Sequence, residues 1–231
     1  MGAVFKREMR AYFCSPLGYI FVGALFFFSG YFFLSYNLYG ATTDMSGLFG
    51  QLFAVALFLI PVLTMRLFSE ERRLGTERQL FSAPVARGAV VAGKYFAALA
   101  VYAAAISGTL LQAAALSVYG RPDWTAIAAN FSGLLLLGAS LISICLFISS
   151  LTESQFIAAV CGFGSGLLLL LLDNAALGAG AAQGLLLTVS FNNRYTPFTY
   201  GVFDIGGAVY FISVAALFCV LAAASLEKRR I

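Results

Sequence analysis

The sequence contains no histidine, and only 10% of its 231 residues are charged. The missing imidazole excludes histidine metal ligands, serine–histidine and cysteine–histidine nucleophile pairs, and histidine proton relays. The 4 cysteines form no Cys-x-x-Cys pair, and most of them lie inside apolar runs. This pattern favours packing roles for the cysteines over metal or redox chemistry.

What the sequence has in abundance is apolar side chains, which make up 61% of the residues. Soluble domains carry about a quarter charged residues. A soluble fold of this length has too large a surface to hide so much apolar side chain. The excess must face lipid, so we expect an all-α integral membrane protein.

Six apolar runs are each about long enough to cross a hydrocarbon core of about 30 Å. They cover residues 17–36, 48–68, 94–118, 128–151, 156–172 and 207–226. Pro61 lies inside the second run, where neighbouring helices can satisfy the backbone groups that it frees. The first run follows a basic start, as in a signal peptide, but it is too long for one and no A-x-A site follows. We therefore interpret it as an uncleaved span.

The positions of lysine and arginine predict the orientation. If the N-terminus is cytoplasmic, all 14 basic residues except Arg121 and Arg194 lie on cytoplasmic segments. We therefore expect one multi-pass transmembrane domain over 1–231, in the cytoplasmic (inner) membrane of the cell, with both termini cytoplasmic. The two longest connections would be a cytoplasmic loop at 69–93 and an extracytoplasmic loop at 173–206.

The N-terminal segment, 1–16, is short, basic and amphipathic. Its apolar residues recur at roughly helical spacing, with basic residues between them. This pattern predicts a helix that lies in the membrane interface. Pro16 would end that helix before the first span.

Two motifs that would indicate enzymes do not hold. Residues 88–94 match G-x-x-x-x-G-K, but Tyr95 follows where a phosphate-binding loop needs a Mg²⁺-binding serine or threonine, and no strand precedes. Ser165 has no histidine to act as its base. Its neighbours Gly162 and Gly166 form a G-x-x-x-G pattern, which favours close helix packing over catalysis.

The cytoplasmic loop is too polar to span and too patterned to be a plain tether. Thr76 would cap a short helix, and Glu77 is favourable in its first turn. Leu80 and Phe81 would form an apolar patch, and Pro84 would end the helix. Such a surface suits docking to a partner, although a solvated positive-inside loop would carry the same charge.

The loop sequence, EERRLGTERQLFSAPV followed by Arg87 and Gly93-Lys94, resembles the signature loop of type 2 ATP-binding-cassette (ABC) permeases. The family pattern is roughly E-E-[KR]-x-x-G-T-x-E-x-L-x-x-[ST]-P-V, followed by Gly-Lys at the start of the third helix. Here Glu77 directly follows Thr76, where the family often has one residue between. Both ends of the chain, at 5–19 and 198–230, are similar to the gliding-motility-like branch, whereas the long outer loop aligns only by position.

The resemblance implies the membrane-spanning permease subunit of an ABC exporter. A separate cytoplasmic ABC ATPase would bind ATP and Mg²⁺, so this chain would hold no cofactor or metal, have no catalytic residues and bind no nucleic acid. Its other partners would be a second permease copy, membrane lipid and a separate extracytoplasmic auxiliary protein.

The resemblance also assigns roles to residues. The coupling surface for the ATPase would be the N-terminal interfacial helix and part of the cytoplasmic loop, namely Glu70, Glu71, Gly75, Thr76, Glu77, Arg78, Leu80, Phe81, Pro84 and Arg87. The outer loop would be a partly re-entrant apolar helical pair, with a gate formed by Phe198, Gly201 and Asp204.

Three other classes stay open at this point. A secondary transporter or channel usually needs ionisable groups inside its spans, and these are nearly absent here; an inverted repeat would favour it, and none is visible. An aspartyl protease could use Asp173 and Asp204, but they flank the outer loop instead of facing each other on two mapped helices. A non-transporting membrane scaffold is the third alternative; a dependence of transport on an ATPase would distinguish a permease from it.

The sequence does not identify the substrate. Lipid-like molecules, polysaccharide, peptides and a mechanical role are all open.

Overall fold

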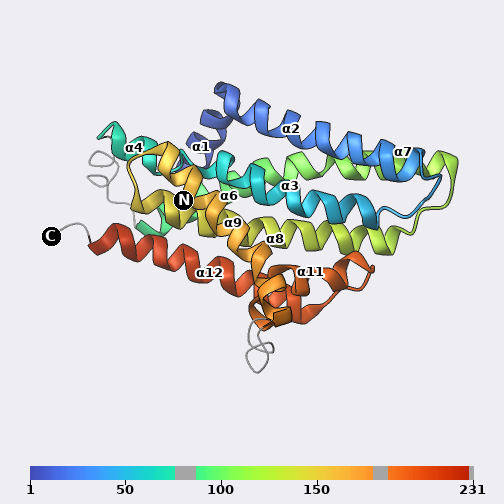
Figure 1. The fold of residues 1–231 in the computed structure, drawn as a ribbon. Coiled ribbons are helices and arrows are strands. Elements are labelled where there is room, and N and C mark those ends of the chain that lie inside the picture. Colours follow the sequence, from blue (N-terminus) through green and yellow to red (C-terminus); the bar gives the residue numbers. More distant parts are fainter. Residues whose placement is uncertain (76–86, 179–186, 229–231) are drawn as a thin grey trace.

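A computed structural model describes residues 1–75, 87–178 and 187–228, and this part of the chain is helical with short connections (Figure 1). The helices are α1 (Gly2–Cys14), α2 (Pro16–Phe32) with its π-helical continuation η1 (Phe33–Leu38), α3 (Ser46–Thr64), α4 (Ser69–Arg73), α6 (Arg87–Ile106), α7 (Gly108–Tyr119), α8 (Trp124–Leu151), α9 (Gln155–Gly178), α11 (Phe191–Thr199) and α12 (Ile205–Lys228).

The all-α membrane fold is confirmed. The stretches long and apolar enough to cross a membrane are Pro16–Leu38, Ser46–Arg73, Arg87–Tyr119, Trp124–Leu151 and Ile205–Glu227. A shorter apolar helix, Gln155–Leu171, occupies the place of the predicted fifth span. Helix α9 itself continues to Gly178, and its 24 residues are about 36 Å long at 1.5 Å per residue. Five long apolar spans are found, and the count of six stays a prediction.

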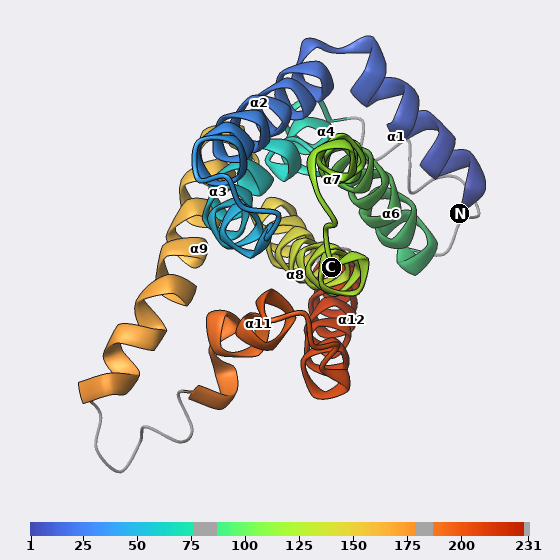
Figure 2. The same cartoon turned by 90° about the vertical axis from the view of Figure 1, so that its right-hand side faces the viewer.

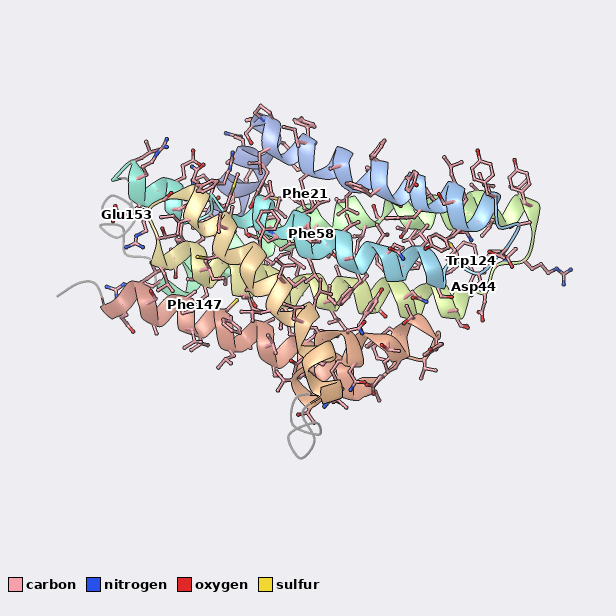
Figure 3. All side chains as sticks on the ribbon, viewed as in Figure 1. Phe21, Asp44, Phe58, Trp124, Phe147 and Glu153 are labelled. Carbon is pink, nitrogen blue, oxygen red and sulfur yellow. The ribbon has the colours of Figure 1, made fainter. Side chains whose placement is uncertain are left out.

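The long helices run roughly along one axis, and α1 and the last described turns of α12 lie toward the same end of it (Figure 1). That end also carries Glu153, whereas Asp44 and Trp124 lie at the opposite end (Figure 3). We call the first end the basic end, because Arg7, Arg66, Arg72 and Arg87 are in the helices or turns there. Its assignment to the cytoplasm stays a prediction from the charge distribution.

Helix α8 lies in the middle of the bundle and packs against α3, α6, α9, α11 and α12 (Figure 2). Small residues allow these close approaches. A Cβ at Gly138 would lie only 2.1 Å from Cε1 of Tyr102, whose hydroxyl donates a hydrogen bond of 2.9 Å to the Leu134 carbonyl. The buried tyrosine hydroxyl is thus satisfied inside the apolar core, as burial requires.

Helix α8 begins where the sequence provides a cap. The Asp123 carboxylate accepts hydrogen bonds from the backbone N–H groups of Thr125 at 2.9 Å and Ala126 at 3.3 Å. Together with a bond from the Thr125 hydroxyl, these interactions lower the pKa of Asp123. The carboxylate therefore stays charged at the positive end of the helix dipole.

The boundary between the interfacial helix and the first span lies where the sequence predicts it. Helix α1 ends at Cys14, Ser15 is extended with ψ 151°, and Pro16 is the first residue of α2. An extended residue before proline and a proline at the first helical position are both favoured geometries. In the view along the bundle, α1 is seen lengthwise while α2, α3 and α8 are seen nearly end-on (Figure 2). This orientation fits a helix in the membrane interface.

The third span differs from the prediction in its start and its continuity. It begins at Arg87 instead of Lys94, so residues 87–93 of the predicted loop are helical. Gly93 lies directly against Val4 of α1, where a Cβ would meet the valine at 2.9 Å, and this packing favours the longer helix. The span is also interrupted at Ser107, between α6 and α7. The start predicted from hydropathy was wrong because Arg87, Gly88 and Gly93 were assigned to the loop and Lys94 was taken as the first residue of the span.

The G-x-x-x-G pattern packs as predicted. A Cβ at Gly162 would lie 2.9 Å from the Cβ of Pro61, and one at Gly166 would lie 3.3 Å from the Leu57 carbonyl oxygen. Helix α9 therefore approaches α3 closely at both glycines. Helix α3 continues through Pro61 to Thr64.

Candidate functional site at the basic end

Lys94 is buried in α6, with its side chain 1% exposed. Its Nζ lies 3.1 Å from Glu8 Oε1 and 3.0 Å from Glu71 Oε2, and it donates a hydrogen bond of 2.6 Å to the Leu67 carbonyl. A buried ammonium is costly unless it is paired and hydrogen-bonded, and here both conditions are met. The Lys94 side chain of α6 therefore contacts α1, α4 and the turn between α3 and α4.

Arg7 completes this group. Its Nη2 donates a hydrogen bond of 2.7 Å to Glu8 Oε1 and a second, short one to Glu71 Oε1. Partial burial acts to lower the pKa of Arg7, but the two carboxylates outweigh it and raise that pKa. We call Arg7, Glu8, Glu71 and Lys94 the Lys94 cluster, in which formal charges of +2 and −2 balance.

The C-terminal half of α1 contacts the end of α3. The Tyr12 hydroxyl donates to the Leu63 carbonyl at 3.1 Å, and burial raises the pKa of Tyr12, which keeps it a donor. Arg66 donates to the Ala11 carbonyl at 3.1 Å and lies 5.6 Å from the centre of the Tyr12 ring. Helix α1 is therefore held at two places: by the ion pairs of Arg7 and Glu8, and by the hydrogen bonds at Ala11 and Tyr12.

Helix α4 also contacts the C-terminal end of α8. The backbone N–H groups of Phe68 and Ser69 donate to Ser149 Oγ at 3.2 and 3.3 Å. Arg72 donates to the Ser150 carbonyl at 2.7 Å, which satisfies an acceptor in the last turn of α8. The beginning of the loop at residues 69–93 is thus bonded to α1, α6 and α8.

The end of the loop lies beside α12. Arg87 lies 3.7 Å from Glu227 of α12, and the Glu227 side chain is 77% exposed. An ion pair this exposed contributes little to stability. The two ends of the loop therefore contact different helices: the first contacts α8 and the Lys94 cluster, and the second contacts α12.

A hollow of about 610 Å³ lies beside α4 at the basic end. Arg73, Glu153 and Phe156 are among its lining residues. Phe156 is mostly exposed. The hollow therefore offers both charged groups and an apolar ring next to the loop.

Of the predicted coupling residues, Glu70, Glu71, Gly75 and Arg87 lie in the described part of the chain. Gly75 follows α4 with φ +69°, the left-handed conformation that glycine adopts after a helix. Glu70 lies 3.7 Å from Arg66, while Glu71 points inward to the Lys94 cluster. The remaining predicted residues, Thr76, Glu77, Arg78, Leu80, Phe81 and Pro84, lie outside the described residues.

Sequence reasoning missed Glu8 and Lys94 as a pair. They are 86 positions apart, so no local pattern joins them. A signal did exist: Lys94 lies inside an apolar helix, and a charge in a span needs a partner. Glu8 is also the one acid among the basic residues of α1.

The predicted gate residues come together at the turn from α11 to α12. Phe198 is fully buried, and a Cβ at Gly133 of α8 would lie 2.6 Å from its Cβ. Gly201 has φ +78° and lies against Ala126 of α8. The Asp204 carboxylate caps α12 by accepting from the backbone N–H groups of residues 206 and 207 at 3.0 and 2.8 Å. Their role as a gate stays a prediction.

Helix α11 lies within the bundle instead of beyond its end. Tyr195 donates to the Phe49 carbonyl of α3 at 3.2 Å, and Asn130 of α8 donates to the Thr199 carbonyl at 3.4 Å. Gly133, which faces Phe198, is about 14 Å along α8 from Trp124 at 1.5 Å per residue. The partly re-entrant character and the outer location of this segment stay predictions.

No group of three or more potential metal ligands occurs in the residues that the structure describes. The lysine of the rejected G-x-x-x-x-G-K match is bonded to carboxylates, an arrangement with no similarity to a phosphate cradle.

Residues 33–224 match the family model described as ABC-2 family transporter protein. This match covers most of the chain, so the chain belongs to the ABC-2 transporter family and is a multi-pass type 2 ABC permease. A comparison with curated proteins found no match. The family match begins after α1, so Arg7 and Glu8 lie outside the matched region. The gliding-motility-like branch stays a prediction.

Proposed function

We propose that this permease subunit belongs to an exporter in the cytoplasmic membrane, and that a separate cytoplasmic ABC ATPase drives it through the loop at residues 69–93. Membership of the ABC-2 family supports an ATPase partner. The observation that carries the loop assignment is the Lys94 cluster, which joins the beginning of the loop to α1 and α6. A force applied to the loop would therefore act on α1, α4 and α6 at once.

The cluster would move as one unit. Removing one partner of a buried ion pair costs about 3–5 kcal/mol, because the remaining charge is left uncompensated. Tilting α1, α4 and α6 together avoids that cost. ATP binding would close two ATPases upon each other, and their motion would tilt these helices in each of two permease copies.

Helix α3 would carry this motion to the outer segment. It runs from the residues before α4 to Phe49, whose carbonyl accepts the Tyr195 hydrogen bond. The rings of Phe53 and Tyr195 are stacked at 5.2 Å. A tilt of α3 would therefore move α11 and the turn that holds Phe198, Gly201 and Asp204, which would open the outer side while the basic end closes.

Within this proposal the ATPase partner binds ATP and Mg²⁺, and the permease performs no chemistry. A second copy of the chain would complete the pathway. A separate extracytoplasmic auxiliary protein would contact the opposite end, near Trp124.

The direct test changes the loop surface. Glu77→Lys combined with Phe81→Ala should abolish capture of the ATPase by the purified permease and the ATP-dependent activity of the pair. Arg121→Ala, at the opposite end of the bundle, is the matched control and should change neither. If the ATPase still bound and was still stimulated by the double variant, the loop assignment would be wrong.

A further inference from the structure

An apolar groove of about 460 Å³ runs between α6, α8 and α12. Its lining residues include Ala92 and Tyr95 of α6, Leu136 and Ala139 of α8, and Ala216 and Cys219 of α12. Small side chains on facing helices leave the space open. The groove lies apart from the Lys94 cluster and from the α11–α12 turn.

The groove opens toward the lipid side of the bundle. Helix α12 lies at the edge of the bundle, beside α8 (Figure 2). Ile212 and Val220, which line the groove, are each more than half exposed. An occupant can therefore enter from the membrane.

The length and position of the groove match one leaflet. Along α12 it extends from Ala223, near the basic end, to Ile212. This distance is about 16 Å at 1.5 Å per residue. Half of a hydrocarbon core of about 30 Å is about 15 Å. The groove therefore has the length of a lipid tail in the leaflet at the basic end.

One described basic residue, Arg87, lies beside the groove. Gly88 lines the groove, and Arg87, directly before it, is 3.7 Å from Glu227. The sequence continues after Glu227 with Lys228, Arg229 and Arg230. Arginine binds phosphate well, and basic segments next to a span attract anionic lipids.

We propose that the groove binds one acyl chain of an anionic phospholipid, whose phosphate lies at Arg87. The lipid would fill the space between α6 and α12 and would neutralise part of the basic charge at the end of α12. The acyl chain would contact none of the residues of the Lys94 cluster, whereas Arg87 belongs both to the proposed phosphate site and to the predicted coupling surface.

The test measures lipid retained by the purified full-length chain. After exchange with equal amounts of phosphatidylglycerol and phosphatidylethanolamine of matched acyl chains, native mass spectrometry should show phosphatidylglycerol bound in several-fold excess. Ala216→Phe fills the groove and should lower bound lipid at least fivefold. Val209→Phe, at an exposed position of the same helix outside the groove, is the control and should leave it unchanged. Arg87→Gln should remove the preference for phosphatidylglycerol while lipid stays bound.

Equal retention by the wild type and Ala216→Phe would overturn the proposal. The proposal would also be overturned if Ala216→Phe retained as much lipid as the wild type but no longer formed a dimer. In that case a second copy of the chain would occupy the groove. If Ala216→Phe does not fold, the native thiol provides a second measurement. In a chain that keeps Cys219 alone, phosphatidylglycerol should slow labelling of Cys219 by a membrane-permeant maleimide more than phosphatidylethanolamine does, and equal rates would contradict the proposal.

Discussion

Replacing Lys94 with methionine removes its charge and shortens the unbranched side chain by only one heavy atom. Glu8 and Glu71 have side chains that are only 11% and 18% exposed, so their carboxylates would lose a buried cation. Removing one member of a buried ion pair costs about 3–5 kcal/mol. Arg7 still contacts both carboxylates, so we expect the lower limit, about 3 kcal/mol.

The assay is thermal unfolding of the purified chain in detergent or nanodiscs. For a domain of about this size, 1 kcal/mol changes Tm by about 2–4 °C, so Lys94→Met should lower Tm by about 6–12 °C. Lys6→Met, at an exposed position of α1, is the control and should change Tm little.

A triple variant separates charge from packing. Glu8→Gln and Glu71→Gln added to Lys94→Met remove the whole set of buried charges except that of Arg7, which is half exposed. Replacing a buried ion pair by neutral groups is often close to neutral, so the triple variant should recover most of the lost Tm. A triple variant as unstable as Lys94→Met, or a Lys94→Met chain as stable as the wild type, would refute the reasoning.

Three further predictions follow from single contacts. Gly138→Ala places a methyl group against the Tyr102 ring and should lower Tm through a cost of about 1–3 kcal/mol in core overpacking, measured by the same unfolding assay. Asp204→Ala removes the cap of α12 and should cost about 1 kcal/mol, with Asp204→Asn, which keeps an acceptor, close to the wild type. Tyr195→Phe loses the hydrogen bond to the Phe49 carbonyl and should reduce substrate export per ATP hydrolysed while the ATPase still binds; unchanged export would argue against transmission through α3.

The positions of the spans could be predicted from the sequence because long apolar runs leave few alternatives in lipid. The boundary at Pro16 and the close packing at Gly162 could also be predicted, since proline and glycine have local steric effects that do not depend on distant partners.

The Lys94 cluster could not be predicted. A hydropathy pattern treats lysine as the mark of a helix end, and it placed the start of the third span at Lys94, one to two turns late. The side chain is embedded because Glu8 and Glu71 compensate it, and those contacts exist only in the folded bundle.

The contacts of α11 could not be predicted from the sequence. Only the resemblance implied that the outer loop, which includes Arg194, is partly re-entrant. Contacts from distant elements, such as the bond between Tyr195 and the Phe49 carbonyl, hold it within the bundle. The same contacts connect the predicted gate to α3.

The most direct test of the coupling claim is the side of the membrane on which α4 ends. In a chain without native cysteines, Leu74→Cys and Tyr39→Cys would place single thiols at exposed positions of the basic end and the opposite end. In intact cells an impermeant maleimide should label Tyr39→Cys and not Leu74→Cys, and in inverted vesicles the ATPase should protect Leu74→Cys. Labelling of Leu74→Cys from outside the cell, or no protection by the bound ATPase, would contradict the account.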